Sequence, residues 1–231
     1  MAARVLSTKK LQPNQKQYLL NAGLSVLEAD FITVHAKAFA IDAINHNLIF
    51  TSQNAFKSFL ANKLSGVFAG SNVYCVGSVT KAIIEQAGFT VSAYADDAQA
   101  LSEIIINQFA GESFTFFSGN LRKDNLPDAL ATAGVTFNEV KVYETVLQPQ
   151  HIKAPLDGLL FFSPSGIESY LLENSITTQM CFCIGATTAA ALNGITNNVI
   201  MANKPSVENV IVQVRNYFAK GHEEGTKKHK E

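Results

Sequence analysis

The chain repeats itself, and this repetition constrains its fold more than any other feature of the sequence. Three segments recur in the same order at offsets of 108 to 111 positions: residues 22–24 as 133–135, 50–54 as 161–165, and 76–80 as 184–188. Ordered recurrence at a near-constant spacing indicates a duplicated structural unit. In a chain of 231 residues, each copy has the size of one small domain.

Within each copy, short apolar strands alternate with helices. Asn47–Phe50 is an apolar strand, Thr51–Asn54 offers residues that cap a helix, and Phe56, Phe59, Leu60 and Leu64 follow at helical spacing. The same alternation predicts further strands at 73–76, 114–117, 159–162 and 180–184. Buried strands that alternate with helices form parallel sheets covered on both faces, so we expect two doubly wound α/β domains.

Composition and charge exclude several classes of protein. The formal net charge is −1, which disfavours a duplex-binding surface, so no nucleic-acid partner is expected. Residues 174–203 contain no charge, but their apolar runs are too short for a membrane span. The three cysteines form no CxxC pair, and no apolar signal core precedes residue 17, so a reducing cytoplasm is expected. We expect a monomer, with residues 221–231 as a disordered tail.

Small, hydroxylic and glycine-rich segments follow the predicted strands. In doubly wound sheets, ligands bind beyond the carboxyl ends of the strands. Those ends here are Ser52-Gln53, Gly77-Ser78, Ser118-Gly119-Asn120, Ser163-Pro164-Ser165-Gly166 and Gly185-Ala186-Thr187-Thr188. Backbone N–H groups at helix N-termini, helped by hydroxyls, bind phosphate or carboxylate. Ordinary helix capping explains any one segment, whereas five segments of the same chemistry favour an anion site.

The usual catalytic motifs are absent from the sequence. No nucleophile elbow, phosphate-binding loop or dinucleotide fingerprint occurs. The five histidines are scattered without the spacing of metal ligands, and Asp96-Asp97 is best explained as a helix cap. We therefore expect no metal and no cofactor. The pattern fits a protein that handles an anionic ligand mainly by positioning it.

These segments are shared with a known family. The matching motifs are Phe50-Thr51-Ser52 with Asn54-Ala55, Val76-Gly77 with Thr80, Ser118-Gly119-Asn120-Leu121, Val142-Tyr143-Glu144-Thr145, Phe161-Phe162-Ser163-Pro164-Ser165-Gly166 and Ile184-Gly185-Ala186-Thr187-Thr188-Ala189. On this ordered set, the chain resembles the uroporphyrinogen-III synthase family over nearly all of residues 3–218.

The resemblance implies two α/β domains joined by a two-stranded linker, with the active site in the cleft between them. Residues 1–36 and 148–220 would form the first domain, and residues 37–147 the second. Val34–Lys37 and Tyr143–Leu147 would be the connecting strands. These boundaries agree with the duplication if the two halves exchange their opening strand–helix–strand segments.

The resemblance also implies the reaction. Hydroxymethylbilane loses its terminal hydroxyl, the resulting azafulvene is attacked at the substituted carbon of the last pyrrole, and a spiro intermediate recloses with that ring inverted to give uroporphyrinogen III. Without enzyme the bilane closes to the uninverted isomer, so the catalyst must mainly enforce one geometry. Proximity and orientation alone can lower an activation barrier by ~7–11 kcal/mol.

The family pattern assigns roles to individual residues. Tyr143 is the expected catalytic residue, as hydrogen-bond donor to the departing hydroxyl; packing within the linker is the alternative explanation of this residue. The expected substrate-binding residues are Ser52, Gly77, Ser78, Thr80, Ser118, Gly119, Asn120, Ser163, Ser165, Gly166, Thr187 and Thr188. Many family members have an arginine after the first strand, where Ser7-Thr8-Lys9 stands here, and a proline at the position of Ala186.

Two rival functions remain open on the residues alone. One is an α/β transferase or lyase for a phosphorylated metabolite, since helix N-termini bind phosphate as well as carboxylate. The other is a two-domain binding protein that closes on a small anion without reacting.

Overall fold

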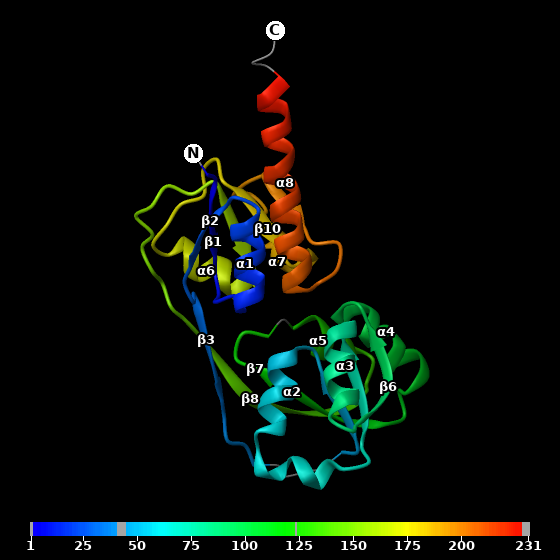
Figure 1. Ribbon diagram of the computed structural model, residues 1–231. Helices are drawn as coiled ribbons and strands as arrows, with labels where there is room; N and C mark the ends of the chain where they lie inside the picture. Colours follow the sequence, from blue (N-terminus) through cyan, green and yellow to red (C-terminus); the bar gives the residue numbers. More distant parts are fainter. Residues whose placement is uncertain (1, 41–44, 123, 228–231) are drawn as a thin grey trace. The chain divides into compact units, whose positions relative to one another are not determined.

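The computed structural model describes residues 2–40, 45–122 and 124–227, and Figure 1 shows the course of the chain. The chain divides into two compact units. Unit 1 contains the residues up to Thr33 and those from Leu147 onward, and unit 2 runs from Val34 to Val146. From the sequence, the divisions were expected after residues 36 and 147, three residues and one residue later than these.

Unit 1 is built on a fully parallel five-stranded sheet in the order β11-β10-β9-β1-β2. Its strands are β1 (Arg4–Ser7), β2 (Ser25–Glu28), β9 (Gly158–Phe161), β10 (Met180–Cys183) and β11 (Val199–Met201). The chain winds from β1 to β2 in one direction and from β9 to β11 in the other. The winding therefore reverses between β1 and β9, which makes this pair the topological switch point of the sheet.

Helices cover both faces of this sheet (Figure 1). They are α1 (Pro13–Asn21), α6 (Pro164–Leu171), α7 (Ala186–Ala190) and α8 (Val207–Lys227). Leu19 of α1 and Val210 of α8 pack on one face with Val5, while Ile167 and Tyr170 of α6 pack on the other. Because neighbouring strand residues point to opposite faces, both faces are apolar and both are covered.

Unit 2 contains a six-stranded sheet in the order β3-β8-β7-β4-β5-β6. Its strands are β3 (Ile32–Ala36), β4 (Asn47–Phe50), β5 (Asn72–Val76), β6 (Thr90–Ala95), β7 (Ser113–Gly119) and β8 (Thr136–Leu147). All pairs from β8 to β6 are parallel. The winding reverses between β4 and β7, so this pair is the switch point of unit 2.

The helical elements of unit 2 are α2 (Gln53–Leu60), the 3-10 helix η1 (Lys63–Phe68), α3 (Ser78–Gln86), α4 (Ala98–Gln108) and α5 (Asn125–Thr132). Phenylalanine rings fill the face under α2, and Phe59 is their centre. Its ring centroid lies 4.9–6.0 Å from those of five others: Phe50, Phe56, Phe68, Phe89 and Phe117. Leu101 and Ile105 of α4 and Leu126 and Leu130 of α5 cover the opposite face.

Strands β3 and β8 connect the two units. The N–H of Gln148 donates to the carbonyl of Phe31, and the N–H of Lys37 donates to that of Val142, each at 2.8 Å. Residue numbers rise along one strand as they fall along the other, so the pair is antiparallel. The two doubly wound α/β units and the two-stranded linker predicted from the sequence are thereby confirmed.

Several local predictions are confirmed, and two elements end elsewhere than expected. Ser52, Asp97 and Ser163 each accept a hydrogen bond from the backbone N–H three residues later, as N-caps do. Helix α2 stops at Leu60 rather than reaching position 64, because η1 folds back and places Phe68 on Phe59. Helix α8 continues to Lys227, into the tail expected to be disordered, and no proline follows Lys220 to end it.

The last residues of that tail, 228–231, lie outside the described part of the chain. None of the described helices combines the length and apolar character that a membrane crossing requires.

Candidate functional site

The switch point of unit 2 brings Ser52 and Tyr143 together. Ser52 lies two residues after the end of β4 at Phe50, and Tyr143 lies on β8, two strands away. The hydroxyl oxygens of the two side chains are 3.2 Å apart. Ser52 Oγ also accepts a hydrogen bond from the N–H of Ala55 at 3.0 Å, as the N-cap of α2. The phenol group of Tyr143 is thus tied to the start of a helix.

Gly119 provides the surface on which the Tyr143 ring lies. The two residues are in register across β7 and β8, after a shift in pairing between Ser118 and Gly119. A Cβ added at Gly119 would lie 2.5 Å from Cε2 of Tyr143 and closer still to Cζ. Real Cβ atoms do not approach other atoms so closely, so glycine is required here for the ring to keep its place.

Ser118 and Gly119 were expected in a loop, but the structure places both in strand β7. Ser118 is buried, and its Oγ donates to Glu139 Oε1 of β8 at 2.5 Å. Asn120 follows the strand and bonds the main chain of Thr145: Nδ2 donates to the carbonyl at 3.0 Å, and Oδ1 accepts from the N–H at 2.8 Å. The two side chains expected to contact substrate carboxylates are therefore bonded to β8.

Sequence reasoning missed Glu139 and Arg122, which stand beside Ser118. The Arg122 guanidinium forms a fork on the Glu139 carboxylate, with Nε 2.5 Å from Oε1 and Nη2 2.9 Å from Oε2, and it also pairs with Asp124. Glu139 raises the pKa of Arg122, and Arg122 in turn holds the pKa of Glu139 below its ordinary value of 4.5. The sequence signal was weak because the pair spans 17 positions.

The depressed pKa of Glu139 predicts an acid-sensitive contribution to stability. An acid whose folded pKa is lowered stabilises the fold above its unfolded pKa and loses this contribution as the pH falls through the folded value. We expect Glu139→Gln to lower the free energy of unfolding at neutral pH, with the difference from wild type shrinking as the pH falls below the ordinary carboxyl pKa of 4.5 and disappearing once the pH has passed the lowered folded value. Urea denaturation of both proteins at a series of pH values measures this difference in the free energy of unfolding.

Glu144→Gln serves as the matched control for this pH series, since Glu144 is an exposed carboxylate on the same strand. Its stability difference from wild type is expected to stay small at every pH. A Glu139→Gln difference that persists unchanged at about pH 3 would show that packing, rather than the ion pair, accounts for the loss.

Gly77, Ser78 and Thr80 lie at the start of α3, beyond β5. Gly77 is the N-cap residue with φ +87°, a conformation that glycine adopts without strain. Thr80 is buried and its Oγ1 faces Gly77, whereas Ser78 is exposed at the first position of the helix. Because β5 neighbours β4, these residues lie at the same edge of the sheet as Ser52.

In unit 1, Ser163 holds the place that Ser52 holds in unit 2. It follows β9, caps α6 through the N–H of Gly166 at 3.0 Å, and lies 3.1 Å from Ser165 Oγ. Thr8, which sequence reasoning passed over, follows β1 at the switch point and donates from Oγ1 to the carbonyl of Leu160 at 2.8 Å. A Cβ at Gly166 would lie 3.3 Å from Ser163 Oγ and 3.6 Å from Thr8 Oγ1.

Thr187 and Thr188 lie in α7, after the neighbouring strand β10. Thr187 is exposed, while Thr188 is buried at 3 % exposure. Helix α7 contacts α6, so both threonines belong to the same edge of the unit 1 sheet as Ser163. The predicted site residues thus gather at the carboxyl ends of the strands, one group in each unit.

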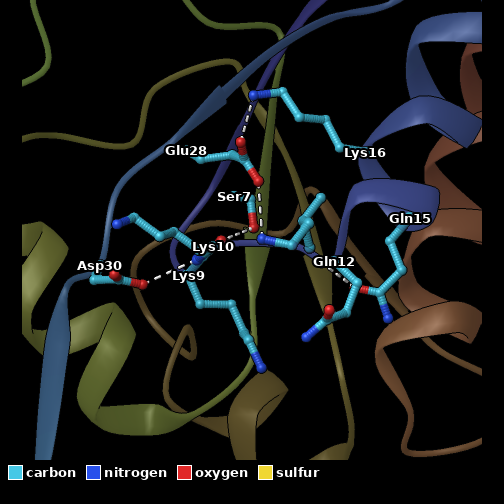
Figure 2. A network of polar contacts seen from close by, with 9 residues as sticks. Ser7, Lys9, Lys10, Gln12, Gln15, Lys16, Glu28 and Asp30 are labelled. Atoms are coloured by element: carbon cyan, nitrogen blue, oxygen red, sulfur yellow. Dashed lines mark hydrogen bonds and ion pairs between the residues drawn. The ribbon is translucent and has the colours of Figure 1, made fainter.

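The segment after β1 is held by the polar contacts drawn in Figure 2. Glu28 accepts from the N–H of Leu11 at 2.8 Å and pairs with Lys16, and Asp30 accepts from the N–H of Lys10 at 2.9 Å. Burial raises the pKa of Glu28, but Lys16 and Leu11 outweigh it and leave the pKa below its ordinary value. Lys9 Nζ lies 5.6 Å from the ring centroid of Phe162, beside Ser163.

The described residues give little support to a cysteine nucleophile or a metal site. Burial raises the pKa of Cys75 to about 11, and those of Cys181 and Cys183 to about 12, so these thiols stay protonated at neutral pH and are poor nucleophiles. No group of His, Cys, Asp and Glu in the described parts of the chain has the arrangement of a metal site.

Comparison with known proteins gives consistent matches. The family model described as uroporphyrinogen-III synthase HemD matches residues 15–211. A uroporphyrinogen-III synthase of Chlorobaculum parvum is 28% identical over 168 residues, which is 63% of this chain and 68% of that protein.

Solved structures match over nearly the whole chain. The uroporphyrinogen-III synthetase of Helicobacter pylori superposes with a TM-score of 0.68 at 19% identity, covering 94% of this chain and 100% of that one. A mutant uroporphyrinogen III synthase of the extremely thermophilic bacterium Thermus thermophilus superposes with a TM-score of 0.68 at 14% identity, covering 95% and 100%. At these identities the two structures support the fold alone.

Proposed function

The chain belongs to the uroporphyrinogen-III synthase family, and within that activity we propose that Tyr143 is the catalytic residue. The protein is an enzyme of tetrapyrrole biosynthesis that cyclises hydroxymethylbilane in a lyase-type reaction. The observation that carries the proposal is the placement of the Tyr143 phenol, 3.2 Å from Ser52 and against Gly119, at the switch point of unit 2.

Ser52 prepares the phenol to donate its proton. Ser52 Oγ accepts the hydrogen bond from Ala55 N–H, and its own O–H proton is available to the phenol oxygen of Tyr143. In that arrangement the phenol proton is free to bond the departing hydroxyl of the bilane. Donation to the leaving oxygen stabilises the negative charge that develops there as the carbon–oxygen bond breaks.

The site residues at the starts of the helices bind carboxylates of the substrate. Helices α2, α3 and α6 each begin at the carboxyl edge of a sheet, where their first N–H groups carry partial positive charge. Further hydroxyl donors at these edges come from Ser78, Ser165 and Thr187. Buried hydroxyl groups at the same edges come from Thr80 and Thr188. Such local dipoles allow a chain of net charge −1 to hold a polyanion.

We also propose that the enzyme acts as a monomer in the reducing cytoplasm. The buried, protonated state of all three cysteines supports the compartment, since none is poised to form a disulfide.

A coupled assay tests the proposal. Hydroxymethylbilane is generated in situ, the protein is added, and the oxidised porphyrins are separated as isomer I or isomer III. Wild type is expected to give mainly isomer III. Tyr143→Phe is expected to lower kcat by about 10²-fold with little change in KM, because it removes a donor used only as the leaving group departs.

Tyr94→Phe is the matched control, since Tyr94 is an exposed tyrosine on β6 of the same unit. Its kcat should equal that of wild type. Full activity of Tyr143→Phe would contradict the catalytic role of the phenol, whereas isomer I as the main product of folded wild-type protein would contradict the cyclising activity itself.

A further inference from the structure

The side chain of Asn120 acts as an extra strand residue for β8. Its carboxamide makes both hydrogen bonds of a strand pairing with the main chain of Thr145, at 3.0 and 2.8 Å. Strand β7 ends one residue earlier, at Gly119. The Asn120 amide therefore makes the hydrogen bonds to β8 that the main chain of β7 no longer makes. Both polar atoms of Asn120 already have a backbone partner.

Ser118 makes a second tie on the other side of Tyr143. Its hydroxyl donates to Oε1 of the Glu139 carboxylate, which the Arg122 fork also binds. Glu139 precedes Tyr143 by four positions and Thr145 follows it by two. The end of β7 is therefore tied to β8 before and after the tyrosine.

These two ties affect the reaction because Tyr143 and Gly119 lie between them. The pairing of β7 with β8 shifts between Ser118 and Gly119, and this shift brings Gly119, the residue without a side chain, opposite Tyr143. If the tie to Thr145 loosened, β8 would lose this register, and the Tyr143 ring would move relative to Gly119 and Ser52. Misplacement by about 1 Å is enough to cost a reaction two orders of magnitude.

We infer that Asn120 is a positioning residue, which fixes the phenol of Tyr143 by bonding the main chain of Thr145, rather than a carboxylate contact. The inference rests on the proposed role of Tyr143. It predicts that loss of the amide affects the turnover step and the choice of isomer more than the binding of the bilane, because the groups that bind carboxylates stay in place.

The test compares Asn120→Ala with Asn174→Ala. In unit 1, Asn174 likewise bonds the main chain with both polar atoms of its amide: Oδ1 accepts from the N–H of Ile152 at 2.8 Å, and Nδ2 donates to the carbonyls of Gln150 at 2.7 Å and Tyr170 at 2.9 Å. Asn120→Ala is expected to lower kcat about tenfold, with KM within about twofold of wild type and a larger share of isomer I. Asn174→Ala should keep the kcat and the isomer ratio of wild type. Equal losses of kcat in both variants would overturn the inference.

A double variant shows whether Asn120 acts through Tyr143. If it does, Asn120→Ala adds no further loss of kcat in the Tyr143→Phe background, because the group being positioned has already been removed. If the two losses multiply, Asn120 acts on the substrate or the fold by another route and the inference fails. Isomer III formation by wild type, measured in the same assay, shows separately whether the proposed function holds.

Discussion

Gly119→Ala is expected to lower kcat for uroporphyrinogen III formation by about 10²-fold. The added methyl group would overlap the Tyr143 ring, with Cε2 at 2.5 Å and Cε1 at 2.7 Å. Strand β7 pairs with β4 as far as Phe117 and with β8 through Gly119, so we expect the ring to move rather than the backbone. Its hydroxyl would then leave Ser52. The coupled isomer assay measures the loss, together with an increased share of isomer I.

Gly111→Ala is the matched control for this substitution. Gly111 lies in the same unit, shortly before β7, and a Cβ there meets nothing within 4 Å. Both variants should fold, as judged by circular dichroism and thermal melting, but only Gly119→Ala should lose turnover. A Gly119→Ala enzyme with wild-type kcat and isomer ratio would show that the position of the ring does not limit the reaction.

Phe59→Ala is expected to destabilise unit 2 by about 3–5 kcal/mol, the cost of emptying a large aromatic site in a core. Phe59 is fully buried and its ring contacts five other phenylalanine rings, on elements from β4 to β7. Neighbouring rings on a sheet and a helix cannot all collapse into the space. Hydrogen exchange should show lost protection in β4, β5 and β7.

Phe59→Leu keeps most of the side-chain volume and should lose clearly less stability. The amides of β9 and β10 in unit 1 report whether the effect is local, because they belong to a separate core. Their protection should change less than that of unit 2. Equal loss of protection in the two units would mean that they unfold as one cooperative block.

The fold was largely predictable because its signals are local. Ser52 and Ser163 stand three residues before the N–H groups they cap, and all four positions of β4 and of β9 are buried. These strands have a largely continuous apolar sequence because they are buried on both faces of the sheet. The duplication strengthened the prediction because each signal occurs twice.

The details of the site were less predictable because they depend on distant partners. Asn120 bonds Thr145 across 25 positions, and Arg122 pairs with Glu139 across 17. The family resemblance leads to the expectation that Ser118 and Asn120 bind substrate, but it does not say which way their side chains point. Only the register of β7 against β8 decides that, and a shift of one residue in this register is not visible in the sequence.

The discontinuous make-up of unit 1 has a consequence for how the protein is made. Strand β1 lies in the middle of its sheet, between β2 and β9, yet β9 begins only at Gly158. At translation rates of about 5–20 residues per second, the edge of the nascent β1–α1–β2 segment stays unpaired for roughly 7–26 s, while unit 2 is synthesised. An unpaired edge is a template for pairing with other chains, so this intermediate is exposed to aggregation until β9 has been made.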